Sequence, residues 1–84
     1  MIFTEWQIER LSEGFGGNTD IANASELQAK KVRDFLTDVA TLSLGQTVDL
    51  ILDTLDPNSS TDLVVRQAAS LCLSVLCEEQ PTEL

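Results

Sequence analysis

The segment from residue 63 to residue 77 constrains the fold more than any other part of the chain. Its spacing is helical, yet apolar residues occur on nearly every side of that helix. The polar residues form only a narrow stripe, made of Arg66, Gln67, Ser70 and Ser74. A helix that is apolar nearly all round must be buried nearly all round. The rest of the chain, or a second molecule, therefore has to cover it.

Two arrangements would cover this helix. In the first, it is the central helix of the fold, and the other helices wrap around it. In the second, one side of it forms a seam with a partner or with another copy of the chain. Small side chains let a neighbouring helix approach closely. The second arrangement therefore predicts an oligomer interface that contains Ser70, Leu71, Ser74 and Val75.

Apolar residues elsewhere in the chain also recur every three or four positions, which is typical of amphipathic helices. No alternation of useful length indicates a strand, and 84 residues make one small domain. We therefore expect an all-α fold, with a single domain over residues 1–84 built as a compact bundle of four helices. These helices are predicted at about residues 4–14, 25–44, 47–55 and 61–79.

Capping boxes mark two of the helix starts. In this motif a Ser or Thr side chain accepts a hydrogen bond from the backbone three residues later, and a Gln or Glu there accepts one from the capping residue. Thr4 with Gln7 fits this motif at the start of the first helix. Ser25 with Gln28 fits it at the start of the second.

Helix ends are predicted at glycine and proline. Gly14 is expected to stop the first helix, which leaves residues 16–24 as a loop. Gly45 is expected to break the second helix, so that Ser43 lies inside that helix. Pro81 is expected to end the last helix, because proline cannot continue the hydrogen-bond ladder.

The third predicted helix has a simple amphipathic pattern. Its inward face is expected to consist of Val48, Ile51, Leu52 and Leu55. The Asp-Pro-Asn-Ser-Ser run at residues 56–60 is rich in turn formers, so it is expected to separate this helix from the last one.

Residues 47–79 resemble one helical hairpin of the HEAT type. A helix ends at Asp56-Pro57, and the next opens with Val65-Arg66 followed by Ala68-Ala69 and a Leu-rich face. Lys31-Val32-Arg33 stands in a similar place earlier in the chain. The resemblance implies helix-on-helix packing and a binding role.

The charge of the chain is strongly negative. Fourteen Asp and Glu stand against five Lys and Arg, for a formal net charge of −9. This balance argues against direct nucleic-acid binding, which requires Lys and Arg to replace counterions. Carboxylates follow two helix faces at one-turn spacing, in the rows Glu5, Glu9, Glu13 and Asp49, Asp53, Asp56. These rows are either solvated faces that keep the protein soluble or surfaces that dock on a basic partner.

Trp6 falls on the outer face of the first predicted helix, beside Glu9, Glu13 and Arg10. An exposed Trp with a charged rim is typical of an interface anchor. Alternatively, Trp6 is covered by residues 16–24, or it stacks on the Arg10 guanidinium one turn away.

The residues that enzymes and metal sites use are scarce. The sequence has no His, so Ser and Cys lack their usual general base. Cys72 and Cys77 face different ways on one helix, and both are expected to be small buried apolar residues. We therefore expect no enzymatic activity, no metal and no cofactor. The longest nearly apolar run is far shorter than the roughly 20 residues of a membrane span, and we expect a cytoplasmic protein.

These patterns favour a non-catalytic protein that regulates another protein by binding it. The expected partner has a basic, nucleic-acid-binding surface, and the chain would act as an inhibitor of the kind that phages deploy against host defences. The expected contact residues are Trp6, Glu5, Glu9, Glu13, Asp49, Asp53 and Asp56. The alternative is a helical assembly subunit that forms a homo-oligomer through its apolar last helix.

Overall fold

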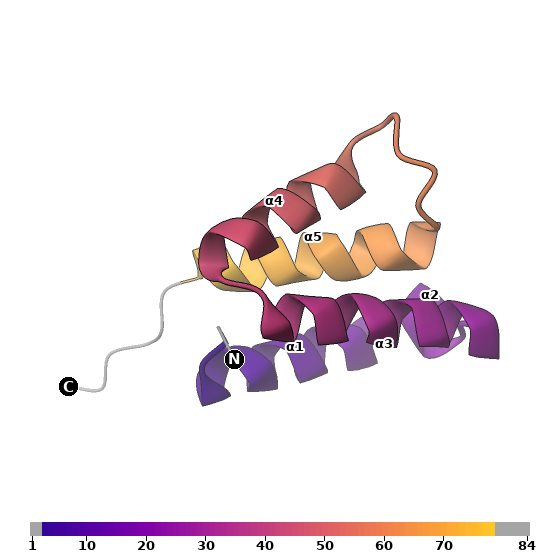
Figure 1. The fold of residues 1–84 in the computed structure, drawn as a ribbon. Helices are drawn as coiled ribbons and strands as arrows, with labels where there is room; N and C mark the ends of the chain where they lie inside the picture. The colour runs from indigo at the N-terminus through magenta and orange to yellow at the C-terminus, as the bar shows by residue number, and fades with distance from the viewer. Residues whose placement is uncertain (1–2, 79–84) are drawn as a thin grey trace.

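The computed structural model describes residues 3–78 of the chain (Figure 1). The predicted all-α fold is confirmed, since the described residues form helices and no strand. The helices are α1 (Glu5–Gly17), α2 (Thr19–Ala22), α3 (Glu26–Thr41), α4 (Leu44–Leu55) and α5 (Leu63–Cys77). All four predicted helices are present, and the short α2 is an additional one.

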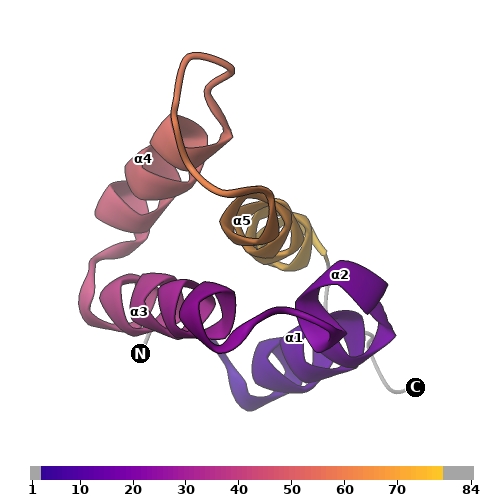
Figure 2. The ribbon, with the colours of Figure 1, turned by 90° about the vertical axis from the view of Figure 1, so that its right-hand side faces the viewer.

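Helix α5 occupies the centre of the bundle (Figure 2). All four other helices contact α5. Helices α1 and α4 run antiparallel to α5, whereas α3 runs parallel to it (Figure 1). The chain thus wraps its own helices around the apolar helix, as in the first of the two arrangements considered for it.

Burial along α5 follows from this central position. Its buried residues are Val64, Val65, Ala68, Ala69, Cys72 and Val75. The side that faces solvent carries Leu63, Ser70, Ser74 and Cys77. The two serines belong to the polar stripe that the sequence indicated, and most apolar residues of α5 lie on the sides that its neighbours cover.

The two predicted capping boxes are both formed. The Thr4 hydroxyl accepts from the Gln7 backbone N–H at 3.2 Å, and Gln7 Oε1 accepts from the Thr4 N–H at 2.9 Å. Ser25 and Gln28 make the same two bonds, both at 3.2 Å. Each box satisfies backbone donors that a helix start leaves without a partner.

A third capping box lies at the start of α4, where the sequence predicted a helix break. Ser43 Oγ accepts from the Gln46 N–H at 3.3 Å, and Gln46 Oε1 accepts from the Ser43 N–H at 3.1 Å. Ser43 is therefore a cap and does not lie inside α3, which ends at Thr41. Gly45 does not break a helix either, because it lies in the first turn of α4.

Gly14 does not end the first helix, because α1 continues to Gly17. The predicted loop at residues 16–24 is also wrong, since α2 forms within it. Asn18 separates the two helices, and its side chain caps α2 by accepting from the Ile21 N–H at 3.0 Å. Gly14 has a packing role instead: a Cβ added there would lie 2.6 Å from Leu71 Cδ2, so the missing side chain lets α1 approach α5 closely.

The turn after α4 is confirmed, and it is longer than predicted. Helix α5 begins at Leu63 rather than at about residue 61, and Glu78 is its C-terminal cap. Asp56 shapes the turn, because its Oδ1 accepts from the Asn58 N–H at 2.8 Å. The predicted stop at Pro81 lies outside the described residues.

The inward face of α4 is shifted from the predicted one. Ile51 is buried and Leu55 packs against the core, as expected. Thr47 and Thr54, however, lie in the core at 0% and 7% exposure, and Leu52 is 53% exposed. Both buried hydroxyls are hydrogen-bonded. Thr47 Oγ1 donates to the Val39 carbonyl of α3 at 3.4 Å, and Thr54 Oγ1 donates to the Leu50 carbonyl within α4 at 2.7 Å. Burying a hydroxyl costs free energy unless it is hydrogen-bonded, so these two bonds allow the threonines to lie in the core.

The close approach at Gly14 gives a testable prediction. Gly14→Leu is expected to lower the free energy of unfolding by about 1–3 kcal/mol, because the new side chain overpacks the contact with Leu71. Gly16→Leu is the matched control, since nothing lies within 4 Å of a Cβ added there. That variant should leave stability unchanged or raise it by up to about 1 kcal/mol. Urea unfolding measures both, and equal effects would contradict the contact.

Candidate interaction surfaces

The two predicted carboxylate rows lie on different sides of the bundle. The α1 row consists of Glu5, Glu9 and Glu13, and the α4 row consists of Asp49, Asp53 and Asp56; all six residues are exposed. Helices α1 and α4 pack on different sides of α5 (Figure 2). The structure therefore presents two separate acidic surfaces, and one flat partner surface cannot contact both.

Arg10 neutralises part of the α1 row. Its Nη1 lies 2.8 Å from Glu13 Oε2, and its Nε and Nη2 lie 2.8 and 2.9 Å from the two carboxylate oxygens of Glu78. The two-pronged bond to Glu78 joins α1 to the end of α5. Hydrogen bonding to Glu78 and Glu13 raises the pKa of Arg10, and the Arg10 bond lowers the pKa of Glu78. Only Glu5 and Glu9 remain as unpaired charges of this row among the described residues.

Trp6 is half-buried rather than fully exposed. Residues 16–24, one of the covers considered for it, lie at the far end of α1 (Figure 1). The Arg10 guanidinium, the other cover considered, is held by two carboxylates. Trp6 is one helical turn before Arg10, and it is partly exposed to solvent.

The α4 row is purely acidic. Helix α4 contains no Lys or Arg, and none of the three aspartates forms an ion pair within the described part of the chain. Leu52 borders this row, since it is three residues after Asp49 and four residues before Asp56, the C-terminal cap of α4. Residues three or four positions apart are neighbours on a helix surface. The outward face of α4 therefore consists of three exposed carboxylates with an exposed leucine at their edge, and we call it the α4 face.

Sequence reasoning found the three aspartates of the α4 face but missed Leu52, which the apolar pattern assigned to the core. A signal was nevertheless present in the sequence. Thr47, Ile51 and Thr54 follow the same helical spacing, and threonine hydroxyls can bond to a carbonyl within the same helix. Either the predicted leucine-rich face of α4 or the face with Thr47, Ile51 and Thr54 could therefore pack in the core, and the structure shows the second.

The four residues of the predicted oligomer interface lie on two different faces of α5. Val75 is 1% exposed, and Leu71 is half-buried against Gly14 of α1. Ser70 and Ser74 are exposed. A partner could therefore reach the two serines but not the Val75 side chain without displacing another helix.

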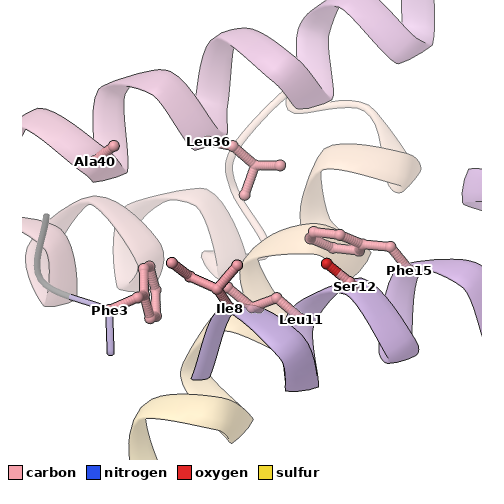
Figure 3. A pocket seen from close by; sticks show the side chains of 7 residues that line it. All are labelled: Phe3, Ile8, Leu11, Ser12, Phe15, Leu36 and Ala40. Carbon is pink, nitrogen blue, oxygen red and sulfur yellow. The ribbon is translucent and has the colours of Figure 1, made fainter. Parts of the chain in front are cut away.

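An apolar groove lies between α1 and α3, with a volume of about 260 Å³ (Figure 3). Both helices pack on α5, and the groove is the space left between them. Its lining residues are Phe3, Ile8, Leu11, Ser12 and Phe15 on the α1 side, with Leu36 and Ala40 on α3. Sequence reasoning did not find this groove, because it arises from the distance between two helices and not from a local pattern. We call it the α1–α3 groove.

The two cysteines differ in their surroundings. Cys72 is fully buried, as predicted, and burial raises the pKa of its thiol to about 11. Cys77 is exposed, so the expectation that it is buried was wrong. It is the last residue of α5, where the helix faces solvent.

Searches for other sites and for relatives gave few further constraints. Within residues 3–78, no three Cys, Asp or Glu side chains are placed to hold a metal ion together. None of the helices described has both the length and the apolar character needed to cross a membrane. No protein-family model, curated protein or solved structure matches the chain.

The Arg10–Glu78 pair gives a pH-dependent prediction. Because the folded-state pKa of Glu78 lies below its ordinary value of 4.5, the pair stabilises the fold above that value, and its contribution is lost as pH falls through the lower folded pKa. Wild type should thus unfold at a higher temperature than Glu78→Gln at pH 7, and the difference should shrink below about pH 4.5. Glu9→Gln controls for loss of one negative charge. A difference that does not change with pH would contradict the pair.

Proposed function

We propose that this chain is a non-catalytic regulator that binds the basic, nucleic-acid-binding surface of a partner protein through the α4 face. The observation that carries the proposal is the exposed row of Asp49, Asp53 and Asp56 with Leu52, which is 53% exposed, at its edge. Protein-protein interfaces usually combine apolar contact residues with polar residues at their margin.

The aspartates of the α4 face repel one another in the free protein. Like charges one helical turn apart cost a few tenths of a kcal/mol per pair. Folding gains nothing from this repulsion, whereas a surface rich in Lys and Arg would relieve it. The remaining negative charge of the chain would also accelerate encounter with such a surface.

The proposed mechanism is competition with nucleic acid. A helix face whose charged groups are all carboxylates, spaced about one turn apart, resembles a phosphate backbone in sign and regularity. By occupying the basic groove of its partner, the α4 face would exclude nucleic acid from that groove. Trp6 and the α1 row are less suited to this role, because Arg10 pairs with Glu13 and lies close to Trp6 in the sequence.

The direct test is binding to a partner captured from native lysate, followed by elution with salt and with heparin. The captured protein should itself bind nucleic acid, and heparin or duplex DNA should displace it. Binding should weaken steeply with salt, because the attraction between exposed charges is screened. A complex whose affinity is the same at low and high salt would contradict the proposal.

Two variants of the α4 face sharpen this test. Asp49→Asn with Asp53→Asn should weaken binding about tenfold at low salt, whereas Glu26→Gln with Asp38→Asn removes two exposed carboxylates elsewhere and should not. Leu52→Ala should also weaken binding, with a change in stability below about 0.5 kcal/mol, because Leu52 is a surface residue. Leu27→Ala is its control, since Leu27 is 64% exposed on α3. Equal losses in the test and control variants would exclude the α4 face.

A further inference from the structure

The α1–α3 groove has the shape of a helix-binding site. Its lining residues on α1 run from Ile8 to Phe15, about 10 Å at the helical rise of 1.5 Å per residue, and Phe3 extends the groove beyond the start of α1 (Figure 3). Its volume of about 260 Å³ is below the roughly 300–1,000 Å³ of small-molecule pockets. Such a groove fits a few apolar side chains from a short helix better than it fits a compact ligand.

The two walls of the groove carry opposite charges. On the α1 wall, Glu5 and Glu9 are exposed and lie three residues before Ile8 and Ser12 respectively, so each is next to a residue that lines the groove. On the α3 wall, Arg33 is exposed three residues before Leu36. None of these three charged residues forms an ion pair within residues 3–78.

We propose that the α1–α3 groove binds an amphipathic helix of another protein. The apolar stripe of that helix would enter the groove, Lys or Arg on one flank would face Glu5 and Glu9, and a carboxylate on the other flank would face Arg33. Apolar residues at positions i, i+3 or i+4, and i+7 are the usual anchors in this mode of recognition. The inference goes beyond the proposed function, because the groove is lined by residues of α1 and α3, whereas α4 packs on another side of α5 (Figure 2).

Shape and charge favour a helix of another protein over a second copy of this chain. Two copies that meet at this surface would place hollow against hollow, so the groove would stay unfilled between them. Each copy would also bring a net charge of −9, which opposes self-association. A helix with a basic flank fills the hollow and meets the opposite charge.

A selection from a display library of random helical peptides, with the full chain as target, tests this inference. Enriched peptides should share an apolar stripe and a Lys or Arg flank, and their scrambled versions should not bind. Enrichment of peptides without this pattern, or no enrichment at all, would overturn the inference.

Variants then locate the site of the enriched peptides. Leu36→Asp should weaken binding at least about a hundredfold, because it places a charge on the apolar α3 wall of the groove. Ser12→Arg places a long side chain at an exposed position that lines the groove, so it should obstruct the groove without changing the core. Peptide binding that survives Ser12→Arg, or that survives Leu36→Asp in a protein shown by circular dichroism to be folded, would overturn the inference.

Charge reversal separates this groove from the α4 face. Glu5→Lys with Glu9→Lys should weaken binding of the basic peptides about tenfold at low salt, and Asp49→Lys with Asp53→Lys should leave it unchanged. If only the α4 reversal matters, the groove inference is wrong and the proposed function is unaffected. Sedimentation of the chain alone completes the test, since a dimer that Ser12→Arg dissociates would identify a second copy as the occupant.

Discussion

Burial of α5 is the interaction on which the rest of this fold depends. A fully buried Val or Leu side chain contributes about 1.5–3 kcal/mol relative to an exposed one, and α5 offers such residues on several sides at once. Every other helix gives its inner face to α5. Helix α1 packs closely on α5 because Gly14 has no side chain there. Helix α4 packs on the core with Thr47, Ile51 and Thr54. The outer faces are consequently free of packing demands and can carry the charge of the molecule.

The sequence was most informative where a pattern has a single physical interpretation. Apolar residues all round α5 predicted that this helix would be covered on nearly every side, and the capping boxes at Thr4 and Ser25 placed two helix starts correctly. It was least informative where two patterns compete. Glycine signals a helix stop, but it also permits close packing, and Gly14 serves the second purpose. Ser43 with Gln46 formed a third capping box that the adjacent Gly45 obscured.

The same distinction between predictable and unpredictable features applies to the candidate surfaces. Exposure of the carboxylate rows could be predicted, because charged side chains are almost never fully buried without a partner. The roles of individual apolar residues could not be predicted, because they depend on which face of a helix its neighbours cover. Trp6 was considered either an exposed anchor or a covered residue and is half-buried, whereas Leu52 was expected in the core and is exposed beside the α4 row. The α1–α3 groove has no local signal, since it depends on how far apart α5 holds two helices.

Native-state amide hydrogen exchange tests the central position of α5 most directly. Amides in its buried part, from Val65 to Cys72, should exchange more slowly than any others and only through global unfolding, because opening this helix removes the surface on which all the others pack. Helix α2, which has four residues and none buried, should exchange fastest among the helices. Exchange of α5 as fast as that of α2, with α1 and α3 still protected, would contradict the account.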